Sequence, residues 1–373
     1  MDLWHLDPTK VYLNHGAYGA CPKVVLAAQE RWRIRMERQP SQFFARDVWE
    51  GLIGEALAPL ASFVGARAED LVFVENATVG TNSVLRSLRF EEGDELLTTT
   101  HAYGAVRSSL SFVAQRWGAS VVATKIPFPC ESEDEIVEAV LRGFSERTRL
   151  LVIDHIASDS ALVFPVKRLA KEAKKRGVMV LVDGAHAPGH IPLDIPSFGV
   201  DWYTGNAHKW LYAPKGCAFL WTAPKWQAET HPLATSFGRL WDAGYQAEFL
   251  WQGTRDLSAW LSVVNALQFH KEMGGGRLME RNRTVAWEGA KELALAWEVP
   301  LPAPKEIFGS MVSIPIPWEG IDSDETRREK VRELWETKGI EIALTLCEGK
   351  GWARVSVAPY NDIGDFEQLA LCG

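Results

Sequence analysis

Residues 180–189 read VLVDGAHAPG, an apolar run that ends at Asp183 in a turn of small residues. A short Val/Leu run of this kind is typical of a strand that is buried on both faces of a parallel sheet. Similar runs lie on either side of it and alternate with helical patterns. This alternation predicts an α/β fold, with a mainly parallel sheet between layers of helices. We expect strands at 71–74, 96–99, 120–125, 150–154, 178–182 and 217–221, and helices at 80–88, 105–117, 133–144 and 166–176.

The pattern changes after about residue 275, where a long helical stretch gives way to a proline-rich link. Beyond the link, the apolar spacing predicts two strands separated by one helix, an order that indicates a smaller α+β domain. The expected elements are a helix at 277–297, the link at 299–304, a strand at 311–316, a helix at 324–338 and a strand at 353–357.

These patterns divide the chain into three expected parts. An N-terminal segment (1–20) precedes a large α/β domain (21–274), which opens with a helix near 23–39, and a small α+β domain (275–373) follows. Because the chain ends soon after residues 365–371, we expect the small domain to lack a last helix.

Composition narrows the class of protein. The 373 residues are 47% hydrophobic and 24% charged, which provides material for a large core. Residues 2–8 are neither basic nor strongly apolar, so we expect no secretory signal. Five cysteines, an odd number without paired spacing, indicate free thiols in a reducing, cytoplasmic compartment. A net charge of −8 argues against nucleic-acid partners, and no stretch is apolar enough to predict a membrane partner.

Metal binding is not expected. The sequence lacks Cys-x-x-Cys pairs, and His186 and His190 are separated by Pro188 and Gly189, which interrupt the helical spacing that a two-histidine metal site uses.

Two residues at strand ends carry the main chemical signal. Asp183 ends an apolar strand, and Lys209 follows in the stretch TGNAHKW at 204–210, just past another buried strand. Ligands of open α/β sheets bind at these carboxyl ends. Pyridoxal 5′-phosphate needs a lysine amine for its Schiff base and a carboxylate to pair with its pyridinium nitrogen. Either residue alone is ordinary, but the pair predicts a site for this cofactor.

Three further stretches agree with that prediction. Residues 75–82 (ENATVGTN) leave a strand and open a helix, whose amides and Thr78 hydroxyl suit a phosphate, although the motif alone is an ordinary helix cap. Residues 251–256 (WQGTRD) form a polar turn before an apolar helix, which is equally typical of a plain cap. In residues 353–361 (ARVSVAPYN), Arg354 lies on an alternating strand, where an inward guanidinium favours a bound carboxylate.

Taken together, the motifs DGAH, HKW, GTRD and R-x-S-x-x-x-Y-N, with YLNHGAYG at 12–19, resemble the class V aminotransferase group of fold-type I pyridoxal-phosphate enzymes. Within that group, the sequence is most similar to isopenicillin N epimerase-like proteins and ergothioneine-pathway C–S lyases. The resemblance runs from residue 12 nearly to the C-terminus. It implies the fold-type I transferase fold, with a seven-stranded sheet between helices in the large domain and a small α+β domain.

The resemblance also implies roles for individual residues. Lys209 would carry the cofactor, Asp183 would pair with its ring nitrogen, and His186 would lie beside the ring and its phenolic oxygen. The expected phosphate ligands are Ala77, Thr78, Asn206 and His208, with Gly253 and Thr254 reaching in from the second subunit of a homodimer with shared sites. The expected substrate-binding residues are Arg354 for the α-carboxylate and Asn14, His15, Gly16 and Ala17 beside it. The residue that stacks on the ring is His101 or Tyr103, and the sequence leaves both open.

Cys347 departs from the related cysteine desulfurases. Their nucleophilic cysteine lies on a longer loop ahead of the arginine strand, whereas Cys347 lies only seven residues before Arg354. We therefore expect a buried or incidental thiol rather than a catalytic one.

The sequence motifs indicate the cofactor more clearly than the reaction. The freed Lys209 amine is expected to act as general base at the α-carbon of an amino-acid substrate, after which epimerisation, β-elimination and transamination diverge. We expect epimerisation, or C–S β-elimination from a cysteine conjugate, ahead of transamination. Tyr103, His101 and His15 are the candidates for a second acid. A non-catalytic protein of the same fold is disfavoured because both Lys209 and Asp183 are present.

Overall fold

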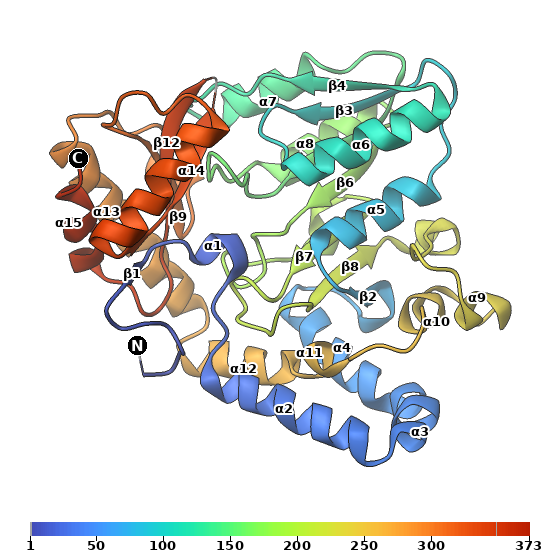
Figure 1. Ribbon diagram of the computed structural model, residues 1–373. Helices are drawn as coiled ribbons and strands as arrows, with labels where there is room; N and C mark the ends of the chain where they lie inside the picture. Colours follow the sequence, from blue (N-terminus) through green and yellow to red (C-terminus); the bar gives the residue numbers. More distant parts are fainter. Residues whose placement is uncertain (1, 348) are drawn as a thin grey trace.

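A seven-stranded sheet forms the centre of the protein (Figure 1). The computed structural model describes residues 2–347 and 349–373. The strand order is β2-β8-β7-β6-β5-β3-β4. The bounds are β2 Leu71–Val74, β3 Glu95–Thr99, β4 Ser120–Thr124, β5 Thr148–Asp154, β6 Met179–Asp183, β7 Trp202–Asn206 and β8 Ala218–Thr222. The strand β8 is antiparallel to β2 and β7, and the other four pairs are parallel, so the expected mainly parallel sheet is confirmed.

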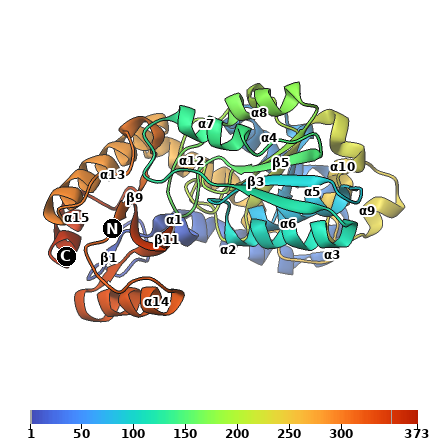
Figure 2. The ribbon, with the colours of Figure 1, turned by 90° about the horizontal axis from the view of Figure 1, so that it is seen from above.

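Helices cover both faces of this sheet, because successive side chains of a strand point to opposite faces. In β5, Leu150 and Val152 join the core cluster that holds α5 and α6, whereas Leu151 and Ile153 join the cluster that holds α7 and α8. Figure 2 shows these two helix pairs on opposite sides of the sheet. The bounds are α5 Ala77–Ser87, α6 Gly104–Trp117, α7 Glu133–Leu141 and α8 Val166–Lys175.

A second group of helices lies along the lower side of the sheet in Figure 1, where α2 contacts both α11 and α12. Within the described residues, no helix is long and apolar enough to cross a membrane. The bounds are α1 His15–Tyr18, α2 Lys23–Arg38, α3 Pro40–Gln42, the π-helical η1 Phe43–Leu52, α4 Ile53–Phe63, α9 Phe237–Leu240, α10 Tyr245–Leu250, α11 Ser258–Leu261 and α12 Val263–Glu272.

The C-terminal part is built on a three-stranded antiparallel sheet of order β11-β12-β9. The N-terminal strand β1 (Val11–Tyr12) joins it from the far end of the chain by pairing in parallel with β10 (Ile340–Glu341). The other bounds are α13 Gly276–Ala296, β9 Met311–Pro315, α14 Asp324–Glu333, η6 Leu334–Lys338, β11 Ala343–Cys347, β12 Lys350–Ser356 and α15 Ile363–Ala370.

Two features differ from the sequence-based expectations. The small domain does have a last helix, α15, which begins at a capping box on Asp362 and packs the ring of Phe366 onto Gly289 of α13. The strand β7 was given no range among the expected strands, although a buried strand was expected just before Lys209, and it is buried throughout. Its sequence WYTGN lacks a Val/Ile/Leu run, but Trp, Tyr and Thr are themselves typical of strands.

Candidate active site

Lys209 lies just past the end of β7 and is enclosed by side chains from separate parts of the chain. Its Nζ atom is 3.1 Å from Nε2 of His186, and its carbonyl oxygen accepts a hydrogen bond from Nε2 of His15 at 3.1 Å. Burial, reinforced by the charge of Arg354 and opposed by that of Asp183, lowers the pKa of the Lys209 amine to about 7. The amine therefore has a large neutral, nucleophilic fraction near pH 7.

Asp183 is the last residue of β6 and lies buried at the carboxyl edge of the sheet. Its Oδ1 accepts a hydrogen bond from the N–H of Ala185 at 2.9 Å. Burial raises the pKa of this carboxyl, while the Ala185 N–H and the nearby Lys209 lower it. A buried carboxylate is costly without a cationic donor. The protonated ring nitrogen of pyridoxal phosphate is such a donor, so this residue fits the cofactor.

The N-terminus of α5 lies beside the end of β7. The N–H of Ala77 donates to Oδ1 of Asn206 at 2.8 Å, and the side chain of Asn76 caps the helix. This close approach depends on Gly80, because a Cβ there would lie 2.4 Å from Oγ1 of Thr204. The helix amides and the positive end of the helix dipole favour a phosphate at this junction.

Two further expected phosphate ligands, Thr78 and His208, flank the same junction. Thr78 is half-buried in the first turn of α5. His208 precedes Lys209, and its Nδ1–H donates to the carbonyl oxygen of Cys217 at 3.0 Å. Burial lowers the pKa of His208 to about 4. A neutral His208 thus presents a lone pair at Nε2, and contact with a phosphate oxygen would require this ring to take up a proton.

Arg354 reaches from β12 toward the large sheet and is buried. Its Nη1 donates to the carbonyl oxygen of Ser158 at 2.7 Å, and its Nη2 donates to Oδ1 of Asn14 at 3.2 Å. Nδ2 of Asn14 donates in turn to Oε1 of Glu341 at 3.2 Å. Nε of Arg354 has no partner among the residues that the structure describes. An unfilled guanidinium donor in a buried position fits a substrate carboxylate.

Hydrogen bonds and close contacts to residues distant in sequence hold the N-terminal loop against the site. The Tyr360 hydroxyl donates to Nδ1 of His15 at 2.7 Å, which leaves Nε2–H for the Lys209 carbonyl. Gly16 allows the loop to approach β9, because a Cβ there would lie 2.5 Å from Sδ of Met311. Ala17 is half-buried in the same turn. Burial lowers the pKa of His15 to about 3, so its ring stays neutral.

His101 is buried between residues that surround the large sheet and Cys347 of the C-terminal part, so its ring is not open to a ligand. Its Nδ1 lies 2.9 Å from Oγ of Ser160, and its ring meets Phe128 edge-on. Sγ of Cys347 lies 3.8 Å from its Nε2. Cys347 itself is only partly buried, so that a buried or incidental thiol, rather than a catalytic one, stays a prediction.

Tyr103 is placed differently. It precedes α6 at the carboxyl edge of the sheet and about half of it is exposed. Its backbone N–H interacts with the carboxyl of Asp154, and its side chain is close enough to Arg354 to affect the pKa of that guanidinium. Of the two stacking candidates, Tyr103 has the open ring.

Asp154 is a site residue that the sequence patterns did not point to. It ends β5 beside Asp183, the end of β6, and is buried. Burial, and then the charge of Asp183, raise the pKa of Asp154 well above its ordinary value. The available signal was a carboxyl residue at the end of an apolar strand, the same signal that singled out Asp183.

Gly253 and Thr254 are exposed on the segment before α11. Apart from the two adjacent residues, no atom of the described chain lies within 4 Å of a Cβ built on Gly253, whose φ is +122°. The next residue, Arg255, ties the segment to Glu75 at 2.5 Å, just ahead of α5.

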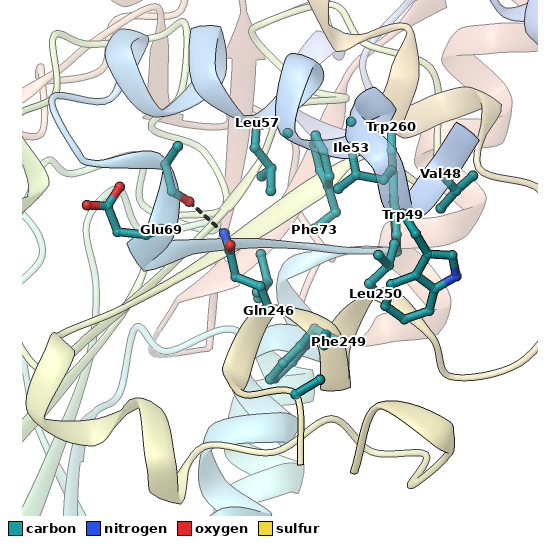
Figure 3. A pocket seen from close by; sticks show the side chains of 16 residues that line it. Val48, Trp49, Ile53, Leu57, Glu69, Phe73, Gln246, Phe249, Leu250 and Trp260 are labelled. Carbon is teal, nitrogen blue, oxygen red and sulfur yellow. Dashed lines mark hydrogen bonds between the residues drawn. The ribbon is translucent and has the colours of Figure 1, made fainter. Parts of the chain in front are cut away.

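An apolar cavity of about 520 Å³ lies apart from these residues, between η1, α4 and α10 (Figure 3). Trp49, Leu57, Phe73 and Phe249 line it, and Gln246 at its edge donates to the carbonyl oxygen of Ala68 at 2.8 Å. None of the expected site residues lines this cavity.

Comparisons with known proteins agree with the geometry. A family model described as "Aminotransferase class-V" matches residues 11–369. The chain is 32% identical to a probable chloroplastic L-cysteine desulfhydrase of Arabidopsis thaliana, over 98% of this chain and 82% of that protein. It is 34% identical to isopenicillin N epimerase of Amycolatopsis lactamdurans, over 98% of this chain and 94% of that protein.

Solved structures show the same architecture. A cystine C–S lyase in complex with its reaction product cysteine persulfide has a TM-score of 0.81 at 21% identity, covering 98% of this chain and 97% of that chain. At this identity the likeness concerns the fold, and it confirms the expected fold-type I fold.

Proposed function

Because the chain belongs to the class-V aminotransferase family, and is therefore an enzyme that uses pyridoxal 5′-phosphate, we propose that it breaks the C–S bond of a cysteine-derived amino acid by β-elimination. The family and the relatives support chemistry of the epimerase or C–S lyase type, with transamination as the alternative. The side chains around Lys209 favour one of these two reactions.

We propose that this chain holds the cofactor through four groups of residues. Lys209 attaches it covalently, Asp183 pairs with its ring nitrogen, and His186 and Tyr103 contact its ring. Its phosphate is held by Ala77, Thr78, Asn206 and His208. When bound, pyridoxal phosphate supplies an electron sink that stabilises negative charge at the substrate α-carbon.

The remaining steps fall to the protein. Arg354, with Asn14 and Ser158 fixing its orientation, binds the substrate carboxylate and so decides which α-bond is presented for cleavage. The Lys209 amine, freed when the substrate amine takes its place, removes the α-proton. The electron pair of that C–H bond forms the Cα–Cβ double bond while the sulfur leaves the β-carbon as a thiolate with the C–S pair. Water then replaces the amine of the product, which gives pyruvate and ammonia.

The observation that favours elimination over epimerisation is that two of the three candidate second acids are engaged within the protein. His15 uses both ring nitrogens, on Tyr360 and on the Lys209 carbonyl. His101 has its nitrogens against Ser160 and Cys347. Epimerisation needs Lys209 as the base and a second group, an acid, on the opposite face of the α-carbon. Elimination needs only the base, and Lys209 is that base.

Product analysis tests this proposal. The loaded enzyme should release pyruvate from L-cysteine, L-cystine or S-substituted cysteines, together with a sulfur product. Lys209→Ala is the control and should release none. Inversion with deuterium uptake at the α-carbon in D₂O, without pyruvate, would instead establish epimerisation, with the half-exposed Tyr103 as the second acid. Formation of a keto acid that retains the β-substituent would establish transamination.

We further propose a homodimer with shared active sites. An exposed apolar patch, formed by Phe237, Leu240 and Trp241 at 51%, 74% and 55% exposure, lies on the segment that leads to Gly253 and Thr254. Patches of this kind mark interaction surfaces. A two-fold partner would cover it and bring Thr254 to the neighbouring site.

Subunit complementation tests the shared site. Lys209→Ala and Thr254→Asp should each be inactive as homodimers. Co-expressed, they should recover activity, because mixed dimers contain one site with an intact Lys209 and an intact Thr254. An active monomer in sedimentation, or no recovery in mixed dimers, would refute the arrangement.

We also propose a reducing, cytoplasmic location, which is supported by Cys21, Cys130, Cys217 and Cys372, none of which forms a disulfide within the described residues. The division at residues 20 and 274 is supported by the separate sheets on either side of the second boundary.

A further inference from the structure

Three neutral imidazole rings surround the Lys209–Trp210 backbone, and their partners define where each proton lies. For His190, the N–H of Ser310 donates to Nε2 at 2.5 Å. Nδ1 of His190 therefore carries the proton and donates to the carbonyl oxygen of His186 at 3.0 Å. Burial lowers the pKa of His190 to about 3, which keeps the ring neutral.

The ring of His186 has a different kind of partner. Nε1 of Trp210 lies 3.4 Å from Nδ1 of His186. An indole N–H can only donate, so Nδ1 of His186 must be the acceptor. The proton of the neutral His186 ring then lies on Nε2, which is 3.1 Å from Nζ of Lys209.

We propose that Trp210 is a positioning residue whose indole N–H holds His186 as the Nε2–H tautomer, so that His186 donates to the Lys209 amine and cannot accept from it. This inference rests on the proposed role of Lys209, but it concerns hydrogen bonds of the protein alone. With Nε2–H of His186 facing it, the free Lys209 amine is favoured in its neutral form.

Packing keeps the indole in place. Trp210 is buried, and its ring lies 4.1 Å from that of His190 and 5.0 Å from that of His15, between centroids. Gly189 gives it room, because a Cβ there would lie 2.4 Å from the Trp210 carbonyl oxygen. The donor cannot rotate away without displacing these neighbours.

The consequence for Lys209 follows from matching donors with acceptors. A charged ammonium would point a proton at the Nε2–H of His186, and two donors facing each other are unfavourable. Turning His186 to the other tautomer would place its Nδ1–H against the indole N–H instead. Of the charged groups facing the amine, Arg354 also favours the neutral form and Asp183 favours the ammonium.

Competitive acetylation of the full-length, cofactor-free protein tests the proposal, with labelling at Lys209 read by mass spectrometry across pH. Trp210→Phe keeps the ring and removes the donor. We expect the midpoint of the labelling profile to rise by about one pH unit, because His186 can then accept from the ammonium. Trp202→Phe is the matched control, since this buried indole N–H donates to Thr230 at 2.9 Å, away from Lys209, and it should keep the wild-type midpoint.

A second arm separates a hydrogen-bond effect from a packing effect. In a His186→Ala background the indole has no path to the amine, so adding Trp210→Phe should leave the midpoint where His186→Ala puts it. NMR of protein with ¹⁵N-labelled histidine should show His186 protonated at Nε2 in the wild type and shifted toward Nδ1–H in Trp210→Phe. An unchanged His186 tautomer and midpoint in Trp210→Phe would overturn the inference. These readouts need no turnover, so they stand apart from any failure of the proposed reaction.

Discussion

Asp154 and Asp183 are register partners at the carboxyl ends of the adjacent parallel strands β5 and β6. Paired residues of parallel strands point to the same face, so two buried carboxyls share one side of the sheet edge. Two like charges in such a position cannot both ionise freely. The charge of Asp183 is one cause of the raised pKa of Asp154. Asp154 is therefore the carboxyl that keeps its proton, which leaves Asp183 to carry the negative charge that the cofactor ring requires.

Asp154→Asn tests that protonation state through stability. Because the pKa of Asp154 is raised in the folded state, its protonation adds to the free energy of unfolding. This contribution is fully present below the unfolded-state pKa near 4 and is lost as pH rises through the folded-state pKa. Asparagine has no such proton to lose. Urea unfolding should therefore show the variant gaining on the wild type by up to about 1.4 kcal/mol per pH unit as pH increases from about 4. The exposed Asp322→Asn is the control. Parallel curves for Asp154→Asn and wild type would contradict a protonated Asp154.

Cofactor capture should follow the titration of Lys209. Since its pKa is lowered to about 7, chiefly by burial, the neutral fraction rises from about a tenth at pH 6 to about nine tenths at pH 8. The rate at which cofactor-free protein takes up pyridoxal phosphate covalently should increase in the same proportion. Borohydride trapping followed by absorbance measures it. Lys209→Ala should trap none, and a midpoint near 10 would show that the amine is not desolvated.

Local patterns predicted most of the sheet and the central residue pair, because both are written in short stretches. Strands β5 and β6 could be predicted because strands buried on both faces are apolar along their length. The turn of small residues after Asp183 marks the end of β6. The strand β7 gives a weaker signal, since WYTGN has strand-favouring Trp, Tyr and Thr but no Val/Ile/Leu run, and its place between β6 and β8 is set by the fold.

Residues that act through contacts distant in sequence could not be assigned from sequence. Whether His101 or Tyr103 faces the ligand depends on Ser160 and Cys347, which engage His101 from other segments. The engagement of His15 by Tyr360 likewise joins the two ends of the chain. By contrast, α15 was predictable, because the capping residue Asp362 and the apolar spacing after it are local signals.

The free energy of unfolding should fall less steeply with decreasing pH in His190→Gln than in the wild type. Burial lowers the pKa of His190 to about 3, so its contribution is present above the unfolded value near 6.5 and is lost as pH falls. Glutamine can still accept from Ser310 but cannot titrate. Between pH 6 and 4 the wild type should therefore lose about 1.4 kcal/mol more per pH unit than the variant. The exposed His5→Gln is the control. Equal slopes for His190→Gln and wild type would mean that His190 charges within the native protein.

Arg354→Lys should impair substrate use far more than cofactor binding or stability. A guanidinium can grip a carboxylate through two parallel hydrogen bonds, and an ammonium offers no such planar pair. Lysine would also give up at least one of the contacts to Ser158 and Asn14 that aim the side chain. We expect kcat/KM to fall by about 100-fold or more, with pyridoxal-phosphate affinity nearly unchanged, because Lys209 and Asp183 remain.

The alternative is that Arg354 only ties the small sheet to the segment around Ser158. Arg281→Lys is the control for that reading, because Arg281, although only half-buried, also donates to a backbone carbonyl, that of Ala358 at 3.1 Å. Thermal melting and steady-state kinetics on both variants separate the two roles. A binding arginine gives Arg354→Lys a large loss of kcat/KM with a melting point close to that of Arg281→Lys. A structural arginine gives it a lowered melting point with ordinary kinetics at temperatures where it is folded.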